Sequence, residues 1–169
     1  MNSNSNLLLD FLVISPSLNW HEVNSSLVSS AELVNIMTDY ASLGLPLYVG
    51  TDSMLYADCC IFSCIIAVHS NELNIANYYF QKEKLKQDKF KNLENKILKE
   101  VELSIKTANF FREHIPEADI EIHVDIGDKE RNATRHLVDS TKGWVKGMGY
   151  QFRIKPNSWA SSVADWHTK

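Results

Sequence analysis

The first 80 residues contain neither lysine nor arginine, so all seventeen basic residues lie between Lys82 and Lys169. A secretory signal peptide begins with a positively charged stretch. Because that stretch is missing, we expect a cytoplasmic protein. The net charge of -4 also excludes the uniformly basic surface that would argue directly for a nucleic-acid partner. The uneven distribution is instead compatible with an acidic metal site beside a basic rim.

Long apolar runs and paired cysteines are also missing. No apolar stretch reaches the length of a membrane span, because serine, asparagine or proline interrupts the longest ones. The three cysteines, Cys59, Cys60 and Cys64, lie within one apolar run. An odd number there indicates reduced thiols in the core and not a disulfide framework. A zinc site is disfavoured because adjacent residues of a strand point to opposite faces.

Hydrophobic periodicity predicts three strands in quick succession, followed by alternating helices and strands. The strands of residues 47–51, 59–68 and 74–81 are joined by short polar connectors and should form an antiparallel meander. A lysine-rich link over residues 82–91 follows them. The remaining elements are predicted as helix 92–114, strand 120–126, helix 132–146, strand 150–154 and helix 159–167.

This order predicts an α/β fold with a mixed five-stranded sheet (β-β-β-α-β-α-β-α) flanked by helices. The length suits one domain, which we assign to residues 47–169. We expect residues 1–46 to form an N-terminal extension packed on that core. Its one helix begins at a cap on Ser29 or Ser30 and runs to about Ala41.

Four acidic residues fall where this topology can bring them together. Asp52 follows the first strand and Asp125 ends the fourth, and parallel strands end at one edge of the sheet. Glu100 borders the apolar stripe of its helix, and Asp165 lies two turns into the last helix. Clustered carboxylates repel one another, and divalent cations relieve that repulsion. Mg²⁺ and Mn²⁺ prefer such hard oxygen ligands, so we expect two such ions here.

A family resemblance is concentrated in five segments: Val49-Gly50-Thr51-Asp52-Ser53, Leu98-Lys99-Glu100-Val101-Glu102-Leu103-Ser104, Ile122-His123-Val124-Asp125-Ile126-Gly127, Gly147-Met148-Gly149 and the stretch from Ile154 to Asp165. These segments resemble the YkuK family of ribonuclease H-like proteins. The resemblance extends from about residue 30 to the C-terminus. It implies a ribonuclease H fold whose catalytic, metal-binding acids are Asp52, Glu100, Asp125 and Asp165. The corresponding glutamate of that superfamily lies near the start of its helix, so Glu94 remains an alternative to Glu100.

Two functions follow as hypotheses. The first is a divalent-metal-dependent nuclease that hydrolyses phosphodiester bonds in RNA, an RNA–DNA hybrid or structured DNA. The second is a catalytically weak or inactive module that binds nucleic acid or a protein. Four residues near these acids are predicted to contact the substrate: Ser53, His123, Arg135 and Lys155.

Basic and aromatic residues away from the four acids have two interpretations each. The lysines of residues 82–91 could follow a phosphate backbone, although a solvated link is the commoner explanation. Arg131, Lys142 and Lys146 are further candidates for phosphate contacts. The tryptophans Trp144, Trp159 and Trp166 are predicted to lie in the core, with stacking on bases as the alternative.

Overall fold

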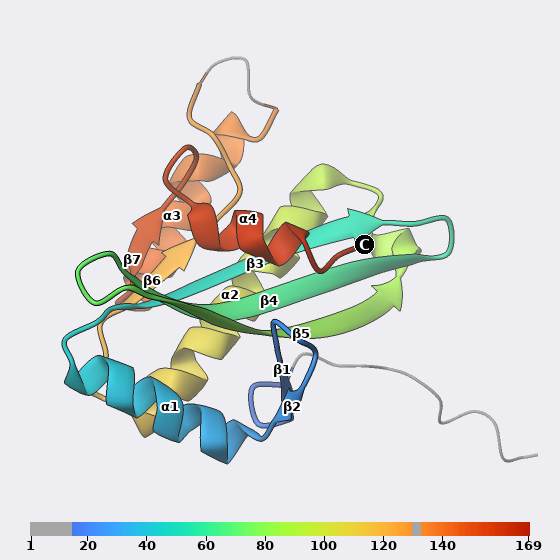
Figure 1. Cartoon of the computed structure of the whole chain (residues 1–169). Coiled ribbons are helices and arrows are strands. Elements are labelled where there is room, and N and C mark those ends of the chain that lie inside the picture. Colours follow the sequence, from blue (N-terminus) through green and yellow to red (C-terminus); the bar gives the residue numbers. More distant parts are fainter. Residues whose placement is uncertain (1–14, 130–132) are drawn as a thin grey trace, which may run out of the picture.

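The computed structural model of the chain describes residues 15–129 and 133–169 (Figure 1). Its strands are β1 Trp20–Glu22, β2 Leu27–Val28, β3 Leu47–Leu55, β4 Cys59–Ser70, β5 Ile75–Lys86, β6 Ile120–His123 and β7 Gln151–Arg153. Its helices are α1 Ser30–Ser42, α2 Leu93–His114, α3 Val138–Gly147 and α4 Trp159–Asp165. Two 3₁₀ turns, Gln87–Phe90 and Arg135–Leu137, complete the order.

The sheet has seven strands in the order β2-β1-β5-β4-β3-β6-β7. The predicted antiparallel meander is present in β3, β4 and β5, and β6 and β7 are added in parallel. The prediction of five strands is wrong by two. The additional strands β1 and β2 pair along the outer edge of β5. They have three and two residues, too few for an alternating pattern to be recognised.

Three strands have a boundary that differs from the prediction by more than two residues. β3 continues to Leu55, so that Asp52 lies inside the strand and not at its end. β5 continues to Lys86, so that the first half of the predicted lysine-rich link is strand. In both cases pairing to β4 extends the strand beyond its apolar part. β6 is shorter than predicted and ends at His123, two residues before Asp125.

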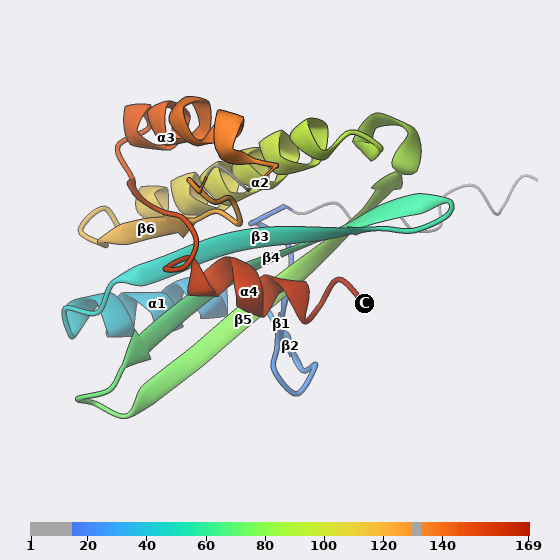
Figure 2. The same ribbon diagram turned by 90° about the horizontal axis from the view of Figure 1, so that it is seen from above.

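The helices cover the sheet unequally (Figures 1 and 2). The long helix α2 packs on β3, β4 and β6 from one side, and the short helix α4 packs on the same strands from the other. The main core lies on the α2 side and includes Leu33 and Met37 of α1. A smaller cluster of Ile65, Ala67, Phe80, Ala160 and Ala164 lies beneath α4.

The N-terminal region shares the main core. Trp20 is completely buried, with its ring edge-on to Phe111 of α2. The predicted helix is present as α1, and the side chain of Ser29 caps it by accepting a hydrogen bond from the backbone N–H of Glu32. The division of the chain between residues 46 and 47 stays a prediction. Within the described ranges, no helix is long and apolar enough to span a membrane.

Candidate functional site

Strand β3 supplies side chains alternately to the two faces of the sheet. Thr51 and Ser53 point toward α2, where the Thr51 hydroxyl lies 2.8 Å from that of Ser104. The Ser53 hydroxyl donates a 2.6 Å hydrogen bond to the Oε1 atom of Glu100. Because side chains of a strand alternate, Gly50 and Asp52 face the opposite side, toward α4. β3 therefore supplies side chains to both faces of the sheet, toward α2 and toward α4.

Helix α4 lies directly on the backbone of β3 at Gly50. A Cβ atom at this position would come within 2.5 Å of the Ser161 nitrogen and 2.6 Å of the Ala160 carbonyl carbon. Only glycine permits so close an approach of two backbones. The first turn of α4 is also held by His123, whose Nδ1 atom accepts a 3.0 Å hydrogen bond from the Ala160 N–H. These contacts position α4 and the Asp165 near its end.

Three of the four predicted acids meet at one hollow at the edge of the sheet. Asp52, Glu100 and Asp125 line a space of about 320 Å³, together with Lys96 and Lys155. The parallel pairing of β3 and β6 ends with Gly50 opposite His123, and Asp52 and Asp125 each follow two residues later. Asp165 does not line this hollow, but its carboxylate, at the end of α4, interacts with that of Asp52.

Burial and mutual repulsion make two of these acids hard to ionise. The pKa of Asp52 is raised to about 7, first by burial and then by the charges of Asp125 and Asp165. The pKa of Glu100 is raised to about 8 by burial and by the charge of Asp52. The Ser53 hydrogen bond and the charge of Lys96 oppose that second shift. Carboxylates whose negative charge is only partly offset in this way fit the site of a cation.

Lysines partly offset the negative charge of the acids. The Nζ atom of Lys155 lies 2.9 Å from Oδ1 of Asp125. Lys96 donates a 3.0 Å hydrogen bond to the backbone carbonyl of Ser53. Lys155 was a predicted substrate contact and lines the hollow, whereas Lys96 was not predicted. Its spacing of four residues from Glu100 along one helix face is the signal that could have revealed it.

The remaining predicted contacts lie elsewhere. His123 is buried, and Glu121 occupies its Nε2 atom at 2.9 Å while Ala160 occupies Nδ1. Arg135 is exposed and donates to the backbone carbonyl of Asp128. Glu94, the alternative to Glu100, is exposed in the first turn of α2 and does not line the hollow. Arg131 lies outside the described residues.

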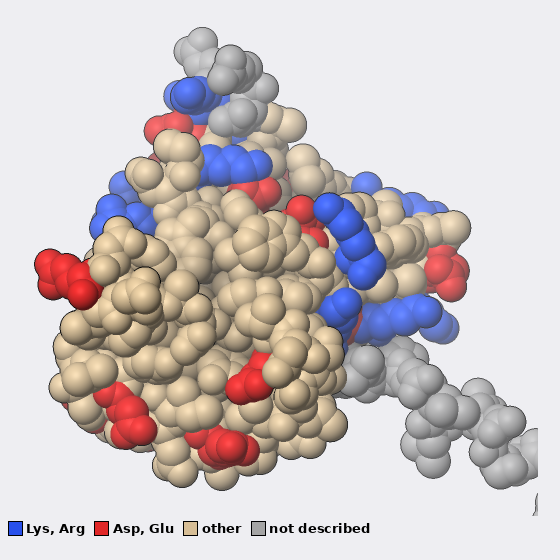
Figure 3. All heavy atoms as spheres, viewed as in Figure 1, with Lys and Arg blue, Asp and Glu red and all other residues tan. Residues whose placement is uncertain are grey.

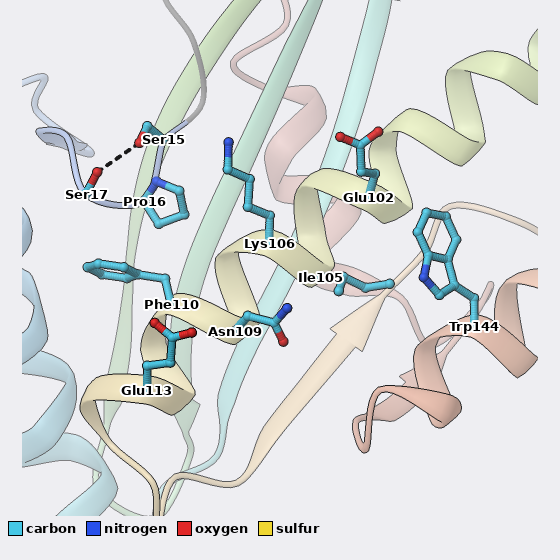
Figure 4. A pocket seen from close by; sticks show the side chains of 10 residues that line it. All are labelled: Ser15, Pro16, Ser17, Glu102, Ile105, Lys106, Asn109, Phe110, Glu113 and Trp144. Atoms are coloured by element: carbon cyan, nitrogen blue, oxygen red, sulfur yellow. Dashed lines mark hydrogen bonds between the residues drawn. The ribbon is translucent and has the colours of Figure 1, made fainter.

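A larger hollow of about 520 Å³ lies on the outer face of α2, between residues 15–17 and Trp144 (Figure 4). Its acids, Glu102 and Glu113, stand well separated along the helix (Figure 4). The carboxylates with raised pKa values are at the smaller hollow. We therefore place the candidate site at the smaller hollow, although it is not the most spacious one.

The four acids supply the hard oxygen ligands that Mg²⁺ and Mn²⁺ prefer. Within residues 15–129 and 133–169, no three His, Cys, Asp or Glu side chains already form a ready-made metal cage. Hydrogen bonds and ion pairs with Ser53, Lys155 and Lys169 hold three of the carboxylates instead. The four carboxylates thus have the chemistry that a divalent cation requires. Hydrogen bonds and ion pairs with other side chains of the protein set the positions of three of them.

Sequence comparison places the chain among known proteins. The family model described as ribonuclease H-like matches residues 29–169. The chain belongs to the ribonuclease H-like family. Membership agrees with the α/β architecture and indicates a nuclease-like or nucleic-acid-binding module. None of the curated proteins shows significant similarity to this ribonuclease H-like chain.

Proposed function

We propose that this protein is a divalent-metal-dependent nuclease that hydrolyses phosphodiester bonds in RNA, an RNA–DNA hybrid or structured DNA. The observation that supports this most strongly is the meeting of Asp52, Glu100 and Asp125 at one hollow, with Asp165 against Asp52. Acids kept partly protonated by burial and repulsion are costly to stability. Their presence together is best explained by a function that requires them.

Asp52, Glu100, Asp125 and Asp165 would hold the ions, for which we propose Mg²⁺ or Mn²⁺ in a pair. When bound, such ions would supply activation of the attacking water and stabilisation of the leaving 3′ oxygen of a phosphodiester. Ser53 orients the Glu100 carboxylate through its hydrogen bond. Lys155, beside Asp125, is close enough to the hollow to contact a substrate phosphate. Because ligands bind metal in their ionised form, metal uptake at neutral pH should release protons from Asp52 and Glu100.

The test is cleavage of end-labelled RNA, hybrid and structured DNA with Mn²⁺, Mg²⁺ or EDTA. We expect cleavage with either ion and a loss of at least about 100-fold in Asp52→Asn and in Asp125→Asn. Asp139→Asn, at an exposed aspartate of α3, is the matched control and should retain wild-type activity. Cleavage in EDTA, or activity untouched by both site variants, would contradict the proposal.

A second candidate function is a binding module without catalysis. The ion pair of Lys155 with Asp125 favours it, since a lysine can neutralise an acid that binds no metal. Calorimetric titration with Mn²⁺ separates the two functions. The nuclease should take up metal with release of protons and lose that uptake in Asp52→Asn, whereas the binding module should show no uptake.

Within the family we propose membership of the YkuK branch. Four of the five segments that carry this resemblance contain the candidate acids, and the fifth, Gly147-Met148-Gly149, lies at the end of α3. Residues 49–53 carry Asp52, residues 98–104 carry Glu100, and residues 122–127 carry Asp125. The stretch from Ile154 to Asp165 forms α4 and its approach. The resemblance is therefore concentrated on the residues that build the site and not on the core alone.

A further inference from the structure

We propose that single-stranded nucleic acid lies across the α4 side of β3, β4 and β5, with phosphates along Lys82, Lys84 and Lys86 and a base stacked on Trp166. This inference rests on the proposed function and names the substrate class and its path to the acids. From the sequence, the lysines of residues 82–91 are either a solvated link or a track for a phosphate backbone. The structure favours the track for residues 82–86, because these residues belong to β5.

The three lysines share a face of the sheet with Asp52. Asp52 is paired with Ser63 of β4, and Ser63 with Lys82 of β5. Residues paired across neighbouring strands lie on the same face, and every second residue of a strand returns to it. Lys82, Lys84 and Lys86 therefore form a row along β5, on the face of the sheet that carries Asp52. Their Cα atoms follow one another at about 6.8 Å, twice the rise of a strand residue.

The lysines are open to a partner, whereas Ser63, which lies between Lys82 and Asp52, is fully buried. Lys82 is half-buried and Lys84 and Lys86 are exposed. Among the residues that the structure describes, none of the three forms an ion pair. The acidic residue beside them is Asp58. Burial and the charge of Asp58 raise the pKa of the Cys59 thiol, and the charge of Lys84 lowers it. The row therefore presents net positive charge beside an acidic pocket.

An exposed aromatic surface adjoins the same region. Trp166 follows Asp165 directly and is 64% exposed, contrary to the predicted core position. Its ring meets Tyr78 of β5 edge-on at 6.5 Å, which fixes it at one side and leaves it open to solvent. Next to it, the His167 ring stacks on Phe80 at 3.7 Å. Lys82 follows Phe80 by two residues on the same face of β5 and therefore lies beside this aromatic surface.

The distribution of charged side chains agrees with a nucleic-acid path on the α4 side of the sheet. In Figure 3, the basic side chains gather in the upper part and toward the right-hand end of β3 and β5, and the region around α1 shows acidic side chains without basic ones. The cause is the absence of lysine and arginine before Lys82. A positive track combined with exposed aromatic rings is how proteins bind single strands, because an unpaired base can stack.

The experiment is fluorescence anisotropy with a labelled 12-nucleotide single strand and the corresponding duplex, in EDTA so that no cleavage occurs. The variant Lys82→Gln/Lys84→Gln/Lys86→Gln should bind the single strand at least tenfold more weakly. The slope of log K against log salt should decrease by about 2, because each lost phosphate contact contributes about 0.7. Trp166→Ala should weaken binding about tenfold, the usual effect of removing a stacking partner.

The matched control is Lys99→Gln/Lys106→Gln/Arg153→Gln, which removes the same charge from α2 and from β7 at the far edge of the sheet. It should change affinity less than twofold. Replacing Lys82, Lys84 and Lys86 by arginine should preserve binding, which excludes a general loss of structure. Equal losses in the two triple-glutamine variants, equal affinity for the duplex, or no effect of Trp166→Ala would overturn the inference. Since the readout is binding without metal, failure of the nuclease proposal would be seen separately in the cleavage assay.

Discussion

The two sides of β3 are built in different ways. On the α2 side, hydroxyl groups connect strand and helix: Thr51 bonds Ser104, and Ser53 bonds Glu100. On the α4 side, the contact is between backbones at Gly50, and a seven-residue helix is held by it. A long helix can be positioned by its large core, whereas a short one depends on local contacts.

Because of this difference, Glu100 and Asp165 differ in how firmly they are held and in how exposed their carboxylates are. Glu100 belongs to a well-anchored helix and is buried almost completely. Asp165 belongs to a short helix near the chain end and remains 40% exposed. The α2 side should therefore respond most to changes of charge, and the α4 side to changes of shape.

The largest effect should come from Glu100→Gln on the α2 side. The ordinary carboxyl pKa of 4.5 is raised to about 8 in the folded protein, so the folded state holds a proton that the unfolded state has released. Without divalent metal, the wild type should lose stability as pH rises between these values, and Glu100 contributes at most about 1.4 kcal/mol per pH unit to that loss. The glutamine variant should lose less, and Asp52 accounts for the remainder. Urea unfolding at pH 5, 6, 7 and 8 measures this.

The control for that series is Glu102→Gln, at an exposed carboxylate of α2. It should follow the wild-type pH dependence. If Glu100→Gln also follows it, then Glu100 is ionised without penalty in the folded protein and the charge argument for the α2 side is wrong.

The next effect in size is that of Gly50→Val on the α4 side. Its side chain would collide with backbone atoms of Ala160 and Ser161, so α4 must move. We expect a loss of about 3 kcal/mol in the free energy of unfolding and, with Asp165 displaced, loss of cleavage. Gly143→Ala in α3 meets no atom within 4 Å and should instead stabilise by about 0.5 kcal/mol. A stable Gly50→Val protein would show that α4 is not held by this contact.

His123→Phe should have a smaller effect on the same side. It leaves the Ala160 N–H without its acceptor at a buried position, which costs about 2 kcal/mol. The exposed His136 gives the control, His136→Phe, which should change stability little. Thermal unfolding followed by circular dichroism compares the two. If they unfold alike, the imidazole does not anchor α4.

Ser104→Ala on the α2 side should have the smallest effect. One hydroxyl pair is lost, which costs about 1 kcal/mol, and the rest of α2 keeps the helix in place. A double-mutant cycle with Thr51→Val measures the coupling between the two side chains. Ser162→Ala, at an exposed position of α4, serves as the control. A loss larger than that of His123→Phe would reverse the comparison between the two sides.

Sequence periodicity predicted much of this fold. The helix of residues 92–114 is present as α2, and its stripe placed Glu100 toward the sheet, where it lies buried. The alternating Ile120, Ile122, Val124 and Ile126 are all buried as predicted. Periodicity failed at β1 and β2, which are too short, and at Lys82 to Lys86, where pairing with β4 and not side-chain character makes a strand.

The sequence by itself determined which residue types could meet: four acids after or beside apolar segments, and one basic half of the chain. That information is local, because period and spacing depend on near neighbours. Only the tertiary structure decided that Lys96 shares the pocket with the acids, that His123 supports α4, and that Lys82 lies on the same face of the sheet as Asp52. Strand register and helix packing set those relations, and both arise from contacts between segments far apart in the chain.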